Sequence, residues 1–298
     1  MKKLLPEVCT IQYGFPFDSA KFSDSNGMPL IRIRDVVRGY SETYTTEEYK
    51  SEYIVHENDL LIGMDGEFNI AKWGKTPALL NQRVCRLAPN DSIDKDYLFY
   101  FMPVALKRIE EKTPFVTVKH LSAKELNKIE IPVLPLEEQR KIAETLSKVD
   151  KLIAFREQQL AKLDELVKAR FVEMFGDINV NNKKWMTYPL GELCTIVRGG
   201  SPRPIERYLG GTIPWIKIGD ATTGENIYLN STKEYIIQEG VKKSRMIKAG
   251  SLIFANCGVS LGFARIITFD GCIHDGWLAM EDIDEKLDKI FLLYSLNQ

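Results

Sequence analysis

Two prolines stand directly before a long helical pattern in the stretch EIPVLPLEEQRKIAETLSKVDKLI, residues 130–153. Pro132 and Pro135 lack a backbone N–H, and each biases the residue before it away from helix. From there to about residue 175 the chain contains neither glycine nor proline, and Gly176 then supplies a stop signal. The pattern predicts one helix of about 37 to 40 residues, on the order of 55–60 Å long, in the middle of the chain.

Apolar residues recur along this helix at heptad spacing, in two neighbouring rows. A helix this long with an apolar face needs a partner, because helix propensity alone is marginal. The alternative is a core helix wrapped by its own domain, but helices of globular proteins average only about 11 residues. We therefore expect a coiled-coil spacer helix. Its apolar seam consists of Ile142, Leu146, Val149, Ile153, Leu160, Leu163, Val167 and Met174.

The sequences on either side of the helix resemble each other in four blocks that keep the same order. A chance likeness of two strand-rich domains is the alternative, but the constant order and the shared Cys-Thr-Ile triplet favour a tandem repeat. The paired blocks are LPEVCTIQYGFPF (5–17) with LGELCTIVRGGSP (190–202), MPLIRIRDV (28–36) with IPWIKIGDA (213–221), NDLLIGMDGE (58–67) with GSLIFANCGV (250–259), and ALLNQRVCRL (78–87) with GCIHDGWLAM (271–280).

Each copy is predicted to be mostly strand. Ile31 and Ile33 alternate with polar or charged residues, as do Ile216 and Ile218 in the second copy, which is typical of a half-buried strand. A short amphipathic helix is expected near the end of each copy. These two helices are predicted at residues 96–110 and 288–296.

The predicted fold class is α+β, with two strand-rich domains in tandem repeat separated by the long coiled-coil helix. We expect the first domain at residues 1–135, the spacer helix at 136–177 and the second domain at 178–298.

Composition narrows the function classes. The net charge of −1 excludes a protein that binds DNA by general phosphate attraction alone, so any nucleic-acid role must rest on local patches.

The N-terminal apolar run is too short for a signal peptide, and no run approaches the roughly 20 apolar residues of a membrane span, so a cytoplasmic location without membrane binding is expected. The five cysteines are far apart and only three histidines accompany them, which argues against a metal site or disulfides and favours buried reduced thiols.

The whole chain resembles the specificity subunit of type I restriction-modification systems. The resemblance rests on TVKHLSAKELNKIEIPVLPLEEQRKIAETLSKVDKLI (117–153), on LPEVCTIQYG and LGELCTIVRGG at the start of each copy, and on the blocks PLIRIRDV and PWIKIGDA. The order of domain, long helix and domain also agrees. The helix entry Pro-Leu-Glu-Glu-Gln-Arg-Lys-Ile is the most specific part.

This resemblance implies two target-recognition domains, each reading one half of an interrupted double-stranded DNA sequence, held apart by paired helices that act as a ruler. It implies that two modification (methyltransferase) subunits, which use S-adenosylmethionine to methylate adenine, dock on the chain. Restriction subunits that use ATP and Mg would join them. The chain itself would bind none of these cofactors and catalyse nothing.

The second copy departs from the family pattern because it stops at Gln298, equivalent to about residue 105 of the first copy. A counterpart of residues 106–176, including a second long helix, is expected to be missing. Two alternatives follow: a homodimer that pairs two seams, or a truncated specificity cassette that is non-functional or regulatory.

No catalytic signature is evident in the sequence. The Asn-Pro-Pro-aromatic signature of adenine methyltransferases is absent, and Gly74-Lys75-Thr76 lacks the first glycine of a phosphate loop, since position 69 is Asn69. Asp65 and Glu67 form one small acidic group in a loop. His274 and Asp275 are expected on a strand, where adjacent side chains point to opposite faces.

Arginine, lysine, asparagine and glutamine near the repeat blocks are candidates for DNA contacts, because these side chains read base edges or hold phosphates. Any one of them has the alternative of being a solvated surface group. Lys119 is favoured because it follows TPFVTV (113–118), where members of the family bring a loop to DNA. The candidates are Gln12, Tyr13, Lys21, Arg34, Arg38, Lys72, Lys75, Lys119 and His120 in the first copy, and Arg198, Arg203, Arg207, Lys242, Lys243, Arg245 and Asn256 in the second.

The two copies are expected to read different bases. Arg34 aligns with Gly219, and Gln12 aligns with Val197, so the candidate side chains differ between the copies. Recognition domains of this family differ in their base contacts, and no contact is carried over residue by residue.

Overall fold

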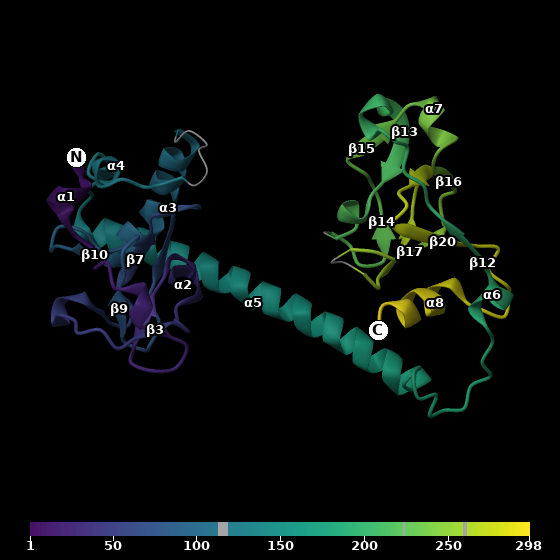
Figure 1. Ribbon diagram of the computed structural model, residues 1–298, viewed down its shortest axis with the longest axis horizontal. Helices are drawn as coiled ribbons and strands as arrows, with labels where there is room; N and C mark the ends of the chain where they lie inside the picture. Colours follow the sequence, from purple (N-terminus) through teal and green to yellow (C-terminus); the bar gives the residue numbers. More distant parts are fainter. Residues whose placement is uncertain (113–118, 223, 259–260) are drawn as a thin grey trace. The chain divides into compact units, whose positions relative to one another are not determined.

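A computed structural model describes residues 1–112, 119–222, 224–258 and 261–298. The chain divides into two compact units, Met1–Gln158 and Gln159–Gln298, and the division falls inside the long helix (Figure 1). We call them the first and second unit. The TPFVTV segment that precedes Lys119 lies outside the described residues.

An antiparallel sheet forms the centre of the first unit, with the strand order β2-β10-β7-β8. Leu60 and Ile62 of β7 face a core shared with the helix α3 (Lys95–Lys112), while Leu61 faces a second core that contains Trp73. Apolar residues on both faces of β7 explain why no alternation marks this strand. The four strands are β2 (Cys9–Tyr13), β10 (Val84–Pro89), β7 (Leu60–Gly63) and β8 (Asn69–Lys72).

A smaller sheet covers the second face of the first unit, in the order β3-β5-β4-β9-β6. Its two middle strands, β4 and β9, run parallel. The strands are β3 (Phe22–Ser23), β5 (Tyr44–Thr45), β4 (Met28–Ile31), β9 (Ala78–Leu80) and β6 (Ile54–Val55). The remaining elements are β1 (Lys2–Leu4), which pairs with β11 (Glu130–Pro132), the helices α1 (Leu5–Val8), α2 (Ile33–Arg38) and α4 (Ala123–Leu126), and the 3₁₀ turns η1 (Ser19–Lys21) and η2 (Ser51–Tyr53).

The second unit repeats this strand order. Its antiparallel sheet runs β12-β20-β17-β18, with β14 added at the edge, and its smaller sheet runs β15-β13-β19-β16 with β13 and β19 parallel. The correspondence confirms the predicted tandem repeat of strand-rich domains. The strands are β12 (Thr195–Arg198), β20 (Trp277–Glu281), β17 (Leu252–Ala255), β18 (Ala264–Ile267), β14 (Tyr228–Leu229), β15 (Glu234–Ile236), β13 (Leu209–Ile216), β19 (Gly271–Ile273) and β16 (Arg245–Ile247).

Short helices complete the second unit at positions that match those of the first. α8 follows the antiparallel sheet as α3 does, and Asp288 caps α8 by accepting a hydrogen bond from Phe291 N at 2.7 Å. Both terminal helices were predicted. The elements are α6 (Leu190–Leu193), α7 (Gln238–Val241) and α8 (Lys289–Leu296), with the 3₁₀ turns η3 (Ile205–Arg207) and η4 (Ile218–Asp220).

The long helix α5 spans Leu136–Phe175, as the sequence predicts. Pro135 stands immediately before it, and its carbonyl accepts from Gln139 N at 3.1 Å. At the other end Gly176 adopts a φ of +81°, and its N–H donates to Val172 O at 2.8 Å. This left-handed residue ends the helix in the way that glycine favours.

The start of α5 docks on the first unit through a buried amide. Gln139 has no exposed surface, and its Oε1 accepts from Asp94 N at 2.8 Å. Its Nε2 donates to Ser92 O at 3.1 Å and Leu134 O at 2.7 Å. Ala143, one turn later, joins the core behind α3. The buried amide of Gln139 thus has hydrogen-bond partners for both its oxygen and its nitrogen, and these bonds fix the start of α5 on the first unit.

The end of α5 packs within the second unit through aromatic rings. The ring of Phe291 on α8 lies 5.6 Å from that of Phe171 and 4.9 Å from that of Phe175. The two α5 rings are also 4.9 Å apart. Trp185 Nε1 donates to Phe175 O at 2.8 Å, which gives one terminal carbonyl of the helix a partner.

Two local predictions are wrong. Ile33 and Ile218 do not continue a strand, because β4 ends at Ile31 and β13 ends at Ile216. A carboxylate starts a helical turn there instead, since Asp35 Oδ2 accepts from the N–H of Arg32 at 2.9 Å. The equivalent bond in the second unit joins Asp220 Oδ2 and Lys217 N at 2.8 Å.

Across the described parts of the chain, no helix combines the length and the apolar character that a membrane crossing requires.

Candidate nucleic-acid interface

Four segments meet at one end of the sheets in the first unit. They are the loop after β2 (14–18), the loop after β7 (64–68), the turn between β9 and β10 (81–83), and residues 119–121. We call this group the first loop cluster. Backbone hydrogen bonds hold it together: Gly14 N to Val84 O at 3.0 Å, Phe15 N to Leu80 O at 2.9 Å, Gln82 N to Phe15 O at 2.9 Å, Met64 N to Arg83 O at 2.9 Å, Gly66 N to Lys119 O at 2.9 Å, and Leu121 N to Met64 O at 2.7 Å.

Gly14 allows the loop after β2 to approach the β9–β10 turn closely. A Cβ atom added to Gly14 would lie 2.0 Å from the carbonyl oxygen of Asn81 and 2.8 Å from that of Leu80. Only glycine fits against backbone at this distance. The chain path at the tip of the cluster is therefore fixed by backbone contacts.

Three ionisable side chains converge on the first loop cluster. His120 Nδ1 lies 2.5 Å from Asp65 Oδ1, and Arg83 Nη1 lies 3.2 Å from the same ring nitrogen. Arg83 Nε also lies 3.6 Å from Asp65 Oδ2. The Arg83 and His120 side chains are about half exposed, while Asp65 is mostly covered. An oriented cation thus stands at the surface with a carboxylate behind it.

The second unit has a matching group of segments, which we call the second loop cluster. It contains the loop after β12 (199–202), the loop after β17 (256–258) and the turn between β19 and β20 (274–276). Two of the backbone bonds have direct equivalents here: Gly199 N donates to Trp277 O at 2.9 Å and Gly200 N to Ile273 O at 3.0 Å. A Cβ on Gly199 would lie 2.1 Å from His274 O, as at Gly14.

Different side chains occupy the turn of the second loop cluster. His274 Nδ1 accepts from Gly276 N at 3.0 Å and lies 3.0 Å from Asp275 Oδ1. Burial lowers the pKa of His274 below its ordinary value, against an opposing effect of Asp275. Ser201 Oγ donates to Asp275 Oδ1 at 2.8 Å, and Arg198 Nε donates to Asp275 O at 3.0 Å.

The surroundings of Asp275 favour the ionised form of its carboxyl. Burial raises its pKa. The Ser201 hydroxyl, His274, Arg203 and Arg198 together lower it by a larger amount, so the net pKa lies below its usual value. The turn of the second unit therefore presents an anion among cations. The turn of the first unit presents a cation held by an anion.

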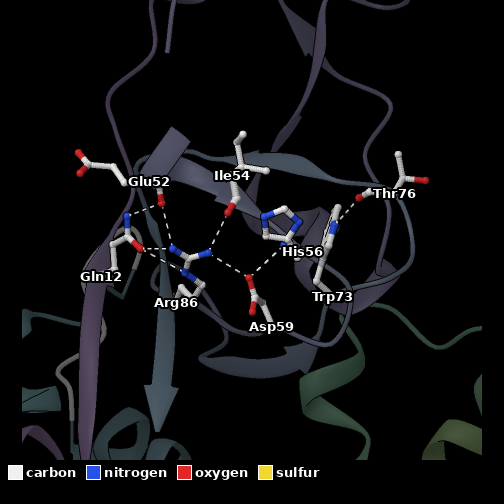
Figure 2. A network of polar contacts seen from close by, with 8 residues as sticks. All are labelled: Gln12, Glu52, Ile54, His56, Asp59, Trp73, Thr76 and Arg86. Atoms are coloured by element: carbon white, nitrogen blue, oxygen red, sulfur yellow. Dashed lines mark hydrogen bonds and ion pairs between the residues drawn. The ribbon is translucent and has the colours of Figure 1, made fainter. Parts of the chain in front are cut away.

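A separate polar network joins the two sheets of the first unit (Figure 2). Arg86 of β10 donates from Nη1 to Asp59 Oδ2 at 3.0 Å and Ile54 O at 2.8 Å, and from Nη2 to Glu52 O at 2.9 Å. Its Nε donates to Gln12 Oε1 at 3.1 Å, and Gln12 Nε2 donates to Glu52 O at 2.8 Å. The guanidinium is largely covered, so this network supports the fold beneath the surface.

A family profile described as the type I restriction modification DNA specificity domain matches residues 1–165 and 182–298. The chain belongs to this family. The EcoBI specificity subunit of Escherichia coli is 41% identical over 164 residues, which cover 54% of this chain and 34% of that subunit. The MjaVIII specificity subunit of Methanocaldococcus jannaschii is 23% identical over 90% of this chain and 70% of its own length.

Solved structures agree with the fold of this specificity-domain chain. All of the chain aligns with 76% of the S subunit of a type I restriction-modification system from M. genitalium, at 14% identity and a TM-score of 0.52. It also aligns with 78% of a chain from a study of the assembly and conformational transition of a type I system, at 17% identity and a TM-score of 0.56. At these identities the likeness concerns the fold alone.

The predicted contacts of the first specificity domain do not all meet at one place. Tyr13 and His120 lie at or beside the first loop cluster, and Gln12 belongs to the Arg86 network instead. Lys72 pairs with Asp96 at 2.8 Å. The others are exposed elsewhere. Lys21 ends η1, and Lys75 lies between β8 and β9. On α2, Arg34 lies 3.8 Å from Asp35 and Arg38 lies 3.9 Å from Glu42.

Lys119, the favoured candidate, is turned back onto its own domain. Its Nζ donates to Glu110 O at 2.8 Å and lies 3.8 Å from Glu110 Oε1. Four fifths of its side chain is covered. Its backbone belongs to the first loop cluster, but its charge is used at the end of α3. Base contact by Lys119 remains a prediction.

In the second specificity domain, two of the predicted cations lie near the turn of the second loop cluster. Arg198 and Arg203 influence Asp275 electrostatically, and Lys243 Nζ donates to Tyr208 OH at 2.7 Å beside the loop after β12. Asn256 N donates to Gly276 O at 2.9 Å, which places Asn256 in the second loop cluster. Three further candidates are exposed: Arg207 on η3, Lys242 just after α7 and Arg245 on β16.

Sequence reasoning missed Arg83 and misplaced His274 and Asp275. The latter two follow β19 in a turn, where their side chains meet, so the expectation of opposite strand faces is wrong. The repeat alignment held a signal for both errors, because it pairs residues 81–83 with 274–276. Two aligned polar triplets between apolar runs indicate a shared turn.

The apolar seam of α5 is exposed along its length. Ile142 is 39% exposed and Leu160 is 64% exposed, and the other six seam residues lie between or near these values. Two parts of the seam lie beside other helices, since Ile142 and Leu146 line a pocket with α3, and Val167 and Met174 line another with Tyr294 of α8. An apolar row that stays at least 39% exposed at every seam residue is typical of a surface that binds another chain or segment.

Other candidate chemistry is limited. Four of the five cysteines are buried free thiols, as expected, but Cys257 is exposed in the second loop cluster. Burial raises the pKa of Cys9 and of Cys85 to about 12. Among the residues that the structure describes, no three His, Cys, Asp or Glu side chains gather closely enough to hold a metal ion.

Proposed function

We propose that this chain recognises an interrupted double-stranded DNA target as the specificity subunit of a type I restriction-modification complex. The observation that carries the proposal is the presence of two loop clusters with equivalent backbone bonds but different side chains, one in each family domain. Loops on a rigid scaffold are where binding residues concentrate. Each cluster would read one half of the target.

Recognition by local patches agrees with the charge of the chain. A net charge of −1 gives little general attraction to phosphates, so affinity must come from a few oriented groups and from partners. Arg83 in the first unit, and Arg198 and Arg203 in the second, lie at or near the two turns. Their different neighbours support different base preferences in the two halves.

Two modification subunits and the restriction subunits would dock on the chain. The methyltransferase partners would supply S-adenosylmethionine, and the restriction subunits would use ATP and Mg, so the specificity subunit would need no catalytic residue of its own. Support comes from family membership and from the exposed seam of α5. A homodimer that pairs two seams is the alternative occupant.

The seam assignment is tested by Leu160→Asp. Because Leu160 is 64% exposed in the single chain, we expect its free energy of unfolding to change by less than about 1 kcal/mol. Association with partner subunits or a second chain should weaken at least tenfold, since an unpaired charge would be buried at the contact.

The control is Gln158→Asp, an exposed position outside the seam of the same helix. It carries the same cost in helix propensity without a charge on the seam. Analytical ultracentrifugation of the chain alone and with its modification subunit gives the readout. Equal association by both variants would refute the seam.

The proposed function is tested by expressing the chain with its modification subunit in a methylation-free host and sequencing the genome with single-molecule detection of methyladenine. A bipartite asymmetric motif supports two working recognition domains. A palindromic motif would indicate a dimer that uses only the first unit. Absence of any motif, together with a failure to assemble, would overturn the proposal in favour of a non-functional or regulatory cassette.

A further inference from the structure

We infer that Arg83 reads a guanine in the half-site of the first unit, with Asp65 and His120 as its positioning residues; this rests on the proposed function. Arg83 stands at the tip of the β9–β10 turn in the first loop cluster. The backbone there is pinned on both sides, since Met64 N donates to Arg83 O at 2.9 Å and Val84 N to Asn81 O at 3.2 Å.

The backbone of Arg83 adopts an unfavourable conformation. Its φ is +70°, in the left-handed region that glycine and asparagine enter far more readily than arginine. Such strain persists where the surroundings impose it, and it gathers at functional sites. Glycine at this position would relieve the strain without changing the turn. The turn itself therefore does not require arginine, which points to a role for the Arg83 side chain.

The side chain of Arg83 is oriented but accessible. Two of its nitrogens face His120 Nδ1 at 3.2 Å and Asp65 Oδ2 at 3.6 Å, yet 52% of the side chain is exposed. Within the described residues the third nitrogen, Nη2, has no hydrogen-bond partner. An ordinary surface ion pair would order the side chain little, whereas two partners on one side direct the free donors outward.

These features fit the recognition of guanine. A planar guanidinium donates two hydrogen bonds to O6 and N7 of guanine in the major groove, and this is the most frequent specific contact between proteins and DNA. Asp65 and His120 reduce the conformational freedom that Arg83 would lose on binding. Arg83 therefore contributes specificity at one base pair, beyond general attraction to phosphate.

The experiment maps methylation by the complete complex of chain and modification subunit, with wild type compared with Arg83→Gly. Glycine tolerates the φ of +70°, so the substitution removes the side chain without adding strain. We expect discrimination at one guanine of the motif to fall on the order of 10- to 100-fold, with the other half-site unchanged. Asp65→Asn should cause a smaller loss at the same base pair.

The matched control is Lys50→Ala, which removes one positive charge from an exposed position of the same unit outside the first loop cluster. Its motif should equal that of wild type. Full discrimination by Arg83→Gly, a loss spread over all positions, or a wild-type motif whose affected half lacks guanine would each overturn the inference. A wild-type complex without any motif would instead overturn the proposed function, so the two failures are distinguishable.

Discussion

The two units use one backbone plan to present different charged side chains. In both, a loop glycine lies against the carbonyl of a turn residue, with Gly14 on Asn81 and Gly199 on His274. The turn then carries Arg83 in the first unit and Asp275 in the second. Because backbone bonds hold the scaffold, the side chains at the tip contribute little to the strand register. They are free to differ, as the proposed recognition of two different half-sites would require.

The largest expected effect tests whether the glycine contacts hold both scaffolds. Gly14→Ala would place a methyl group 2.0 Å from a backbone oxygen, and Gly199→Ala would do so at 2.1 Å. No side-chain movement relieves these contacts, so the strands must separate. We expect each substitution to lower the free energy of unfolding of its own unit by about 4 kcal/mol, measured by urea denaturation with hydrogen exchange to separate the units.

Gly219→Ala serves as the control because a Cβ there meets no atom within 4 Å. It should change the free energy of unfolding by less than about 1 kcal/mol. A strong effect of Gly14→Ala with a weak effect of Gly199→Ala would break the equivalence of the two loop clusters.

The sequence was sufficient for the features that local chemistry decides. Pro135 and Gly176 mark the ends of α5 because one lacks an N–H and the other adopts a left-handed conformation. The repeat blocks also predicted which segments form equivalent strands in the two units. The alternation at Ile31 and Ile33 was misleading, since Asp35 caps the N–H of Arg32 and starts a helix where the pattern continues.

The candidate site was harder to predict because tertiary contacts decide which cations are free. Lys119 is a residue type that often contacts DNA, but its ammonium group is bound to Glu110. Gln12 has its amide in the Arg86 network. Arg83 was overlooked because it stands between two strands in sequence, and its turn conformation arises from pairing of those strands with others far along the chain.

The next effect sharpens the difference in how the units hold α5. Phe171→Ala removes a buried ring from the second unit, and we expect its free energy of unfolding to fall by about 3 kcal/mol. Gln139→Ala leaves the N–H of Asp94 and two carbonyls without partners in the first unit, with an expected loss of about 2 kcal/mol. Hydrogen exchange along α5 should show each loss only at its own end of the helix.

Exposed neighbours on α5 provide the controls. Phe155→Ala removes a ring that is 53% exposed, and Glu138→Ala removes an exposed carboxylate from the first turn. Both should change exchange at the helix ends by much less than the buried substitutions. Loosening of both ends by either Phe171→Ala or Gln139→Ala would mean that the two docking contacts are coupled through the helix.

The smallest effect is a pH dependence that belongs to the second unit alone. Burial holds the pKa of His274 below its ordinary value of 6.5, so the unfolded chain takes up a proton before the folded chain as the pH falls. The contribution of His274 to stability is therefore complete above that value and declines as the pH falls through it toward the folded pKa.

Asn81 occupies the equivalent position in the first unit and does not titrate. His274→Asn should thus flatten the loss of stability of the second unit between about pH 7 and pH 5, as measured by urea denaturation across that range. The exposed His56, changed to Gln, is the control, and an unchanged pH profile for His274→Asn would assign the acid sensitivity of the second unit to other groups.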